Sequence, residues 1–119
     1  MIKVQSLLSP HEREALEVFV ERLYTHCGDR TRSVILFGSK ARGDAGLDSD
    51  VDVLVALTND DPRLRSQVRR LAARVSLEYN LLLSVHAVGR SQWDKLTRYR
   101  FPLYCAIKSE GIDLTPQPA

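Results

Sequence analysis

The segment from Val34 to Leu57, which reads VILFGSKARGDAGLDSDVDVLVAL, constrains the fold of this chain more than any other. Two apolar runs rich in β-branched residues, 33–37 and 51–57, flank a polar connector that contains three glycines. Short runs of this composition, bounded by glycine or polar residues, are typical of β-strands. The sequence therefore predicts two neighbouring strands joined by a polar connection that turns sharply.

Two aspartates, Asp50 and Asp52, stand at the start of the second run. Because side chains alternate faces along a strand, both carboxylates are expected on one side, with Cα atoms roughly 6.5–7 Å apart. Carboxylates this close repel each other, and a cation removes that repulsion. Mg²⁺ prefers oxygen ligands and is usually held by one or two carboxylates together with substrate phosphates. The spacing therefore predicts a magnesium site at Asp50 and Asp52.

The end of the first run has the residue types of a phosphate-binding loop. Gly38 allows the backbone to approach a ligand closely because it has no Cβ. If residues 39–42 form a short helical turn, its N–H groups and positive dipole end would face the phosphates. Ser39 would add a hydroxyl donor, and Arg42 a forked cation suited to phosphate. Gly-Ser alone is an ordinary turn and Asp-x-Asp alone an ordinary strand entry, but together they predict a site for a metal-bound nucleoside triphosphate.

This pattern, Gly38-Ser39 followed after the ten residues 40–49 by Asp50-x-Asp52, resembles the minimal nucleotidyltransferase (MNT) branch of the DNA polymerase beta-like nucleotidyltransferase superfamily. The resemblance covers most of the chain. It implies an α/β (α+β) fold, with a mixed sheet and flanking helices, and metal-dependent transfer of a nucleoside monophosphate. It also implies roles for particular residues: Asp50 and Asp52 in catalysis and Mg²⁺ binding, and Gly38, Ser39, Arg42 and Ser49 in binding ATP.

The resemblance also implies a partner. Small MNT proteins often pair with a HEPN-domain toxin encoded beside them, and some transfer AMP from ATP to a tyrosine of that toxin. The expected function is therefore that of an antitoxin and protein adenylyltransferase. The alternative is a catalytically weak or inactive MNT module that neutralises its HEPN partner by forming a complex. A transferase that acts on RNA or on a small molecule is a third reading.

One departure from the family pattern concerns a later strand, on which active relatives usually carry a third acidic residue. The corresponding run, 81–88 (LLLSVHAV), contains no Asp or Glu. By alternation Ser84 and His86 share a face, and either is a candidate for the third position. Histidine can bind a metal or accept a proton, with an unperturbed pKa of about 6.5. A lone histidine in a strand is also typical of a packed or surface residue, so the third position stays open.

Composition bounds the remaining possibilities. A chain of 119 residues is expected to form one domain, 1–119, and its 44% hydrophobic and 27% charged residues are typical of a globular protein. No apolar run approaches the roughly 20 residues that span a bilayer, and the N-terminus does not resemble a signal peptide, so a cytoplasmic protein is expected. The net charge of +2 gives no argument for direct nucleic-acid binding. Cys27 and Cys105 lack metal-site spacing and are expected to be small buried or half-buried residues.

Basic and aromatic residues gather in the second half of the chain. Arginines between 63 and 74, and lysines and arginines between 95 and 108, are either solvated helix faces or a surface for an acidic partner or RNA. The aromatic residues are expected mainly in the core, although several exposed together would indicate a partner surface. These residues are Trp93, Tyr99, Phe101 and Tyr104.

Helices are expected around the strands. Ser9, Pro10 and Glu12 form a capping-box start, and Gly28 is a typical helix stop. Further helices are expected from Pro62 to Asn80, from a Ser91 cap through Leu96, and from Pro102 to Gly111, followed by a loose tail at 115–119.

Overall fold

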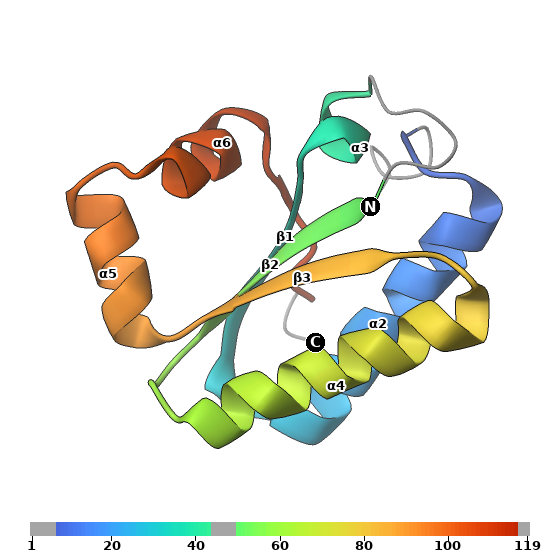
Figure 1. Ribbon diagram of the computed structural model, residues 1–119, viewed down its shortest axis with the longest axis horizontal. Coiled ribbons are helices and arrows are strands. Elements are labelled where there is room, and N and C mark those ends of the chain that lie inside the picture. Colours follow the sequence, from blue (N-terminus) through green and yellow to red (C-terminus); the bar gives the residue numbers. More distant parts are fainter. Residues whose placement is uncertain (1–6, 44–49, 117–119) are drawn as a thin grey trace.

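The computed structural model describes residues 7–43 and 50–116, which form a four-stranded mixed sheet with helices on both faces (Figure 1). The strand order is β3-β2-β1-β4; β1 is antiparallel to β2 and β4, and β2 is parallel to β3. The predicted α/β fold with a mixed sheet is confirmed. The elements are α2 (Pro10–Cys27), the 3₁₀ turn η1 (Gly28–Arg30), β1 (Thr31–Phe37), α3 (Ser39–Arg42), β2 (Val51–Leu57), α4 (Pro62–Tyr79), β3 (Leu83–Val88), α5 (Arg90–Arg98), α6 (Pro102–Glu110) and β4 (Ile112–Asp113).

Each face of the sheet has its own apolar core. Helices α2 and α4 lie beside each other on one face, where Phe19 and Val68 are fully buried among the strand side chains (Figure 1). Helices α5 and α6 lie towards the other face, where Leu96 and Ile107 pack with Leu54 of β2. Strand β2 is therefore covered on both sides, which agrees with its nearly continuous apolar sequence.

The helix boundaries follow local capping chemistry. The Ser9 hydroxyl accepts a hydrogen bond from the Glu12 N–H at 3.1 Å, and the Glu12 carboxylate accepts one from the Ser9 N–H at 2.9 Å. The predicted capping box is thus confirmed, as is the stop of α2 at Gly28. Helix α4 is capped by Asp61 and ends at Asn80 in the left-handed conformation, where the sequence predicted its end.

Ser91 was predicted to cap the helix before Leu96, and this prediction was wrong. Helix α5 begins at Arg90 with Gly89 as its N-cap, two residues earlier than predicted. The Ser91 N–H and hydroxyl instead donate to the Asp60 carboxylate at 2.9 and 2.6 Å. Because Asp60 is 31 residues away, this competition has no local sequence signal.

Strand boundaries also differ from the sequence prediction. Strand β1 begins at Thr31, before the expected run 33–37, and β3 begins at Leu83 rather than at 81. Strand β4 was not predicted because two residues are too few to show an alternating pattern. In the predicted tail, the Thr115 hydroxyl accepts a hydrogen bond from the Val34 N–H at 3.1 Å, while residues 117–119 lie outside the described part of the chain.

The aromatic residues of the last third divide into two pairs. Trp93 and Tyr104 pack edge to face against the second core, with ring centroids 6.2 Å apart, as predicted for core residues. Tyr99 and Phe101 are 62% and 45% exposed and stack on each other, so the core assignment was wrong for this pair. None of the described helices is long and apolar enough to cross a membrane.

The two cysteines also differ from each other. Cys27 is buried in the first core, as expected for a small apolar residue. Cys105 is exposed, and its thiol donates a weak hydrogen bond to the Arg100 carbonyl, so the expected burial was wrong there.

A buried ion pair joins α3 to the start of α2. Lys40 is only 4% exposed, and its ammonium lies 2.6 Å from the Glu12 carboxylate. Burial by itself raises the pKa of Glu12, but the hydrogen bonds from Lys40 and Ser9 outweigh it and the net pKa is lowered. The short helix α3 is thereby anchored to a longer one.

Backbone geometry also brings the end of β1 against β2. Phe37 pairs with Asp52 in the antiparallel register, and Gly38 follows with φ of +79°. A Cβ at Gly38 would lie 2.4 Å from Asp52 Oδ2 and 3.3 Å from Asp52 Cβ. Since the Asp52 Cβ is fixed by its strand, rotation of the carboxylate alone would not relieve the contact. Only glycine fits this position without a shift of the backbone.

We expect Glu12→Gln to lower the free energy of unfolding at pH 7 by about 3 kcal/mol, the lower end of the effect of breaking a buried ion pair. The folded-state pKa of Glu12 is depressed, so its contribution is present above the unfolded pKa and is lost as pH falls through the folded pKa. Urea unfolding at pH 7 and through the acid range should therefore show that the free energy of unfolding falls more steeply with decreasing pH in wild type than in Glu12→Gln. Glu78→Gln, which removes an exposed ion pair with Arg22, is the control, and equal destabilisation by both variants would contradict the prediction.

We expect Gly38→Ala to destabilise the fold more than Gly28→Ala. Both glycines have positive φ, but a Cβ at Gly28 would meet nothing within 4 Å. Gly28→Ala should therefore show only backbone strain of about 1–3 kcal/mol. Gly38→Ala adds the overlap with Asp52, a further loss of about 1–3 kcal/mol. Urea unfolding of the two variants measures the difference, and equal values would argue against a tight contact at Asp52.

Candidate functional site

The candidate site lies where β1 ends and β2 begins. Asp50 is exposed just before β2, and Asp52 is partly buried within it. The negative charge of Asp50 acts on Asp52, so the two carboxylates are electrostatically coupled. Gly38 lies against Asp52, so the predicted phosphate loop and the predicted metal ligands are next to each other.

The electrostatics of the site centre on Asp52. Burial raises the pKa of its carboxyl most strongly, and the charge of Asp50 raises it further. His86 and Arg42 oppose the shift, while Glu110 adds to it, and the net pKa is above the ordinary value. A partly buried carboxylate that is repelled by its neighbour favours a cation. The donor chemistry therefore fits a hard metal ion such as Mg²⁺.

The predicted helical turn at 39–42 is confirmed as α3. Gly38 precedes it, and Gly43 follows it in the left-handed conformation. Ser39 is partly buried at the start of this turn, and Arg42 stands at its end. Ser49, the remaining residue expected to bind nucleotide, lies outside the described ranges.

Strand β3 places Ser84 and His86 on the same face of the sheet as Asp52. Ser84 is the register partner of Asp52 in the parallel pair, and His86 is the partner of Leu54. The His86 ring is exposed and lies 5.4 Å, centroid to centroid, from Phe37. In residues 7–43 and 50–116, no three His, Cys, Asp or Glu side chains gather closely enough to hold a metal. The register places Ser84 directly beside Asp52 and His86 one step further along the same face, and the role of each at the third position stays a prediction.

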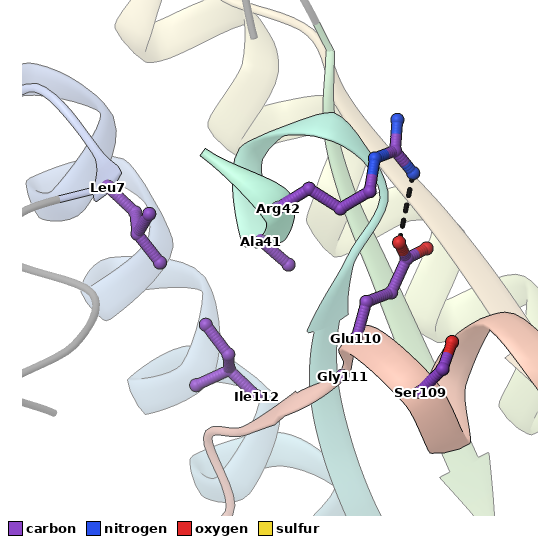
Figure 2. A pocket seen from close by; sticks show the side chains of 7 residues that line it. All are labelled: Leu7, Ala41, Arg42, Ser109, Glu110, Gly111 and Ile112. Atoms are coloured by element: carbon purple, nitrogen blue, oxygen red, sulfur yellow. Dashed lines mark hydrogen bonds and ion pairs between the residues drawn. The ribbon is translucent and has the colours of Figure 1, made fainter. Parts of the chain in front are cut away.

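Glu110 is a component of the site that the sequence did not reveal. It ends α6, where one carboxylate oxygen accepts a hydrogen bond from the Gly38 N–H at 3.3 Å. The other oxygen lies 3.0 Å from Arg42 Nη1 (Figure 2). Because 72 residues separate Glu110 from Gly38, no spacing pattern connects them. The only local signal was the helix stop at Gly111.

A cavity of about 730 Å³ adjoins this ion pair. Figure 2 shows Arg42 and Glu110 at one side and apolar side chains at the other. Its lining does not include Asp50 or Asp52, so the cavity borders the phosphate loop and not the aspartates. The lining residues are Leu7, Ala41, Arg42, Ser109, Glu110, Gly111 and Ile112.

Sequence comparison identifies a family and relatives of this chain. Residues 13–110 match the family described as "Nucleotidyltransferase domain". The chain is 41% identical over 73 residues to "Putative protein adenylyltransferase MJ0141" of Methanocaldococcus jannaschii, a match that covers 60% of this chain and 73% of the relative. It is 29% identical over 91 residues to "Putative protein adenylyltransferase MJ0604" of the same organism, covering 76% of this chain and 87% of the relative.

Solved structures share the fold. The "Structure of putative minimal nucleotidyltransferase" aligns with a TM-score of 0.50 at 29% identity, covering 85% of this chain and 94% of that one. The "Crystal structure of the toxin-antitoxin with AMP-PNP" aligns with a TM-score of 0.53 at 18% identity, covering 81% and 69% of the two chains. At that identity the second match supports the fold alone.

The resemblance that the Gly38-Ser39 and Asp50-x-Asp52 pattern suggested is thus confirmed at the level of the family. The family match extends from within α2 to the last residue of α6. The chain belongs to the nucleotidyltransferase-domain family and is an enzyme of that class, related to proteins named as protein adenylyltransferases.

Proposed function

We propose that this nucleotidyltransferase transfers AMP from ATP to a tyrosine of a HEPN-domain partner and acts in the cytoplasm as its antitoxin. The observation that carries the proposal is the close approach of the Gly38 loop to Asp52, which puts a phosphate-type loop beside two carboxylates. The relatives named as protein adenylyltransferases support a protein acceptor. The toxin–antitoxin structure, similar in fold, was solved with the ATP analogue AMP-PNP, and we take ATP and a toxin partner from it as part of the proposal. The HEPN domain of the partner comes from the resemblance to small MNT proteins.

In this mechanism the loop binds and orients the triphosphate. Ser39 would donate a hydrogen bond from its hydroxyl to a phosphate oxygen, and Arg42 would supply positive charge. Asp50 and Asp52 would hold Mg²⁺, which supplies charge neutralisation at the phosphates when it is bound with ATP. Ser84 and His86 face the same region and are kept as third-position candidates.

The acceptor step needs a base. The tyrosine oxygen would form a bond to the α-phosphorus while the bond to pyrophosphate breaks. One of the two aspartates would accept the phenolic proton as the general base. Pyrophosphate is the leaving group, so the products are adenylylated partner and pyrophosphate.

A second candidate function rests on β3, which carries Ser84 where active relatives are expected to have an acid. On this reading the chain neutralises the toxin by forming a complex, with little transfer. The two functions differ in whether the aspartates are needed for neutralisation.

We expect the Asp50→Ala, Asp52→Ala double variant to label the partner at least about 100-fold more slowly than wild type, because base and metal ligands are both lost. The assay uses ATP labelled at the α-phosphate, Mg²⁺ and the HEPN-domain protein encoded beside this chain. A partner with its acceptor tyrosine changed to Phe should take up no label. Asp29→Ala, Asp94→Ala is the matched control, since both residues are exposed and outside the site.

Equal labelling by wild type and the site variant would reject the enzymatic proposal. If the site variant still binds and silences the toxin, neutralisation occurs by complex formation. If it binds the toxin but leaves it active, AMP transfer is the means of neutralisation.

We expect Asp52→Asn to stabilise the metal-free protein at pH 7 by about 0.5–1 kcal/mol. The folded-state pKa of Asp52 is raised, so ionisation of its carboxyl above that pKa disfavours the folded state. The same variant should lose stabilisation by Mg-ATP, which for wild type is about 2.7 kcal/mol at 100 times Kd. Urea unfolding with and without Mg-ATP measures both effects. A variant that is less stable without metal, yet still stabilised by Mg-ATP, would contradict the proposed ligand role.

A further inference from the structure

We propose that Glu110 is a positioning residue for the nucleotide: its carboxylate fixes Arg42 and the Gly38 backbone in the arrangement that receives the phosphates. This inference rests on the proposed nucleotidyl transfer at the same site and adds a residue from the far end of the described chain.

The Glu110 carboxylate holds both ends of α3. Gly38 is the residue before this helix and Arg42 is its last residue. Glu110 accepts the Gly38 N–H with one oxygen and pairs with the Arg42 guanidinium through the other. A helix of four residues has little stability of its own, because nucleation is unfavourable. The Glu110 carboxylate therefore sets the orientation of the loop as well as that of one side chain.

The two side chains of the Arg42–Glu110 ion pair are unequally buried. The Glu110 side chain is 16% exposed, whereas the Arg42 side chain is 47% exposed. Both residues line the cavity, and the carboxylate is the more enclosed of the two (Figure 2). Arginine loses considerable side-chain entropy when it is fixed. An arginine already held by Glu110 would lose less of this entropy on binding phosphate.

The opposite reading is that Glu110 competes with the phosphates. Its carboxylate pairs with the same loop and the same arginine that an anion would use, so ATP would have to displace it. The two readings predict opposite signs: removing a positioning residue weakens Mg-ATP binding, whereas removing a competitor strengthens it. The fixed, two-ended contact with a backbone N–H and a side chain favours positioning.

The experiment compares Glu110→Gln and Glu110→Ala with wild type. Mg-ATP binding is measured by calorimetry without acceptor, and KM and kcat are measured in the labelling assay with the partner. We expect Glu110→Ala to weaken Mg-ATP binding about tenfold, the size of one lost charge-assisted hydrogen bond. Glu110→Gln keeps an acceptor for the Gly38 N–H and should show a smaller effect. KM should rise with kcat changed less than about twofold, since the lost interaction acts mainly on binding.

A double-mutant comparison tests whether the effect passes through Arg42. In an Arg42→Ala background, Glu110→Gln should have little further effect on Mg-ATP binding. Glu78→Gln breaks another Arg–Glu pair, with Arg22, and should leave binding unchanged. If Glu110→Ala does not fold, Glu110→Gln is the deciding variant because it retains size and an acceptor.

The outcomes separate the two proposals. If Mg-ATP binds either Glu110 variant as tightly as wild type, or more tightly, the positioning role is overturned while labelling by wild type leaves the enzyme proposal intact. If wild type binds Mg-ATP but does not label the partner, the proposed transfer is rejected. The positioning role of Glu110 is then tested only by the Mg-ATP affinities of its variants. If wild type binds no Mg-ATP, both proposals are overturned.

Discussion

The contact between the Gly38 backbone and the Asp52 side chain is the constraint on which the site depends. The antiparallel pairing of β1 and β2 brings the end of one strand to the start of the other, with Phe37 opposite Asp52. The next residue must then pass the carboxylate with positive φ and no Cβ. The turn at Gly38, proposed as a phosphate loop, and the Asp52 carboxylate therefore come together through strand register, before any long side chain contributes.

Register alone does not hold α3 in place, because four residues form only about one turn. Among residues 7–43 and 50–116, ion pairs to two distant parts of the chain hold it. Lys40 pairs with Glu12 at the start of α2, and Arg42 pairs with Glu110 at the end of α6. The Lys40–Glu12 pair is buried between α3 and α2, whereas the Arg42–Glu110 pair is half exposed beside the cavity. Lys40 therefore ties the turn to the interior of the protein, whereas Arg42 lies at the surface beside the cavity.

The sequence predicted the features that depend on neighbours along the chain. The capping box at Ser9, the strand 51–57 and the turn at 39–42 all follow from local composition, and the structure has them. Two of the failures share a cause. Ser91 donates to the Asp60 carboxylate instead of capping the helix as predicted. Glu110, near the other end of the described chain, accepts a hydrogen bond from the Gly38 N–H. Contacts of this kind depend on tertiary packing, which periodicity and capping rules do not encode.

The absence of an acid on β3 has a consequence for the order of binding. Ser84 occupies the register position opposite Asp52, so this strand contributes a hydroxyl and no charge there. Within the described residues the carboxylates that act on Asp52 are Asp50 and Glu110, and Glu110 is already committed to Gly38 and Arg42. A magnesium ion would then take two protein carboxylates and must complete its shell with water or phosphate oxygens. Metal affinity should therefore be low without nucleotide, and each ligand should raise the affinity for the other by the same factor. The proposed phosphate loop would thereby also determine how fully the proposed metal site is occupied.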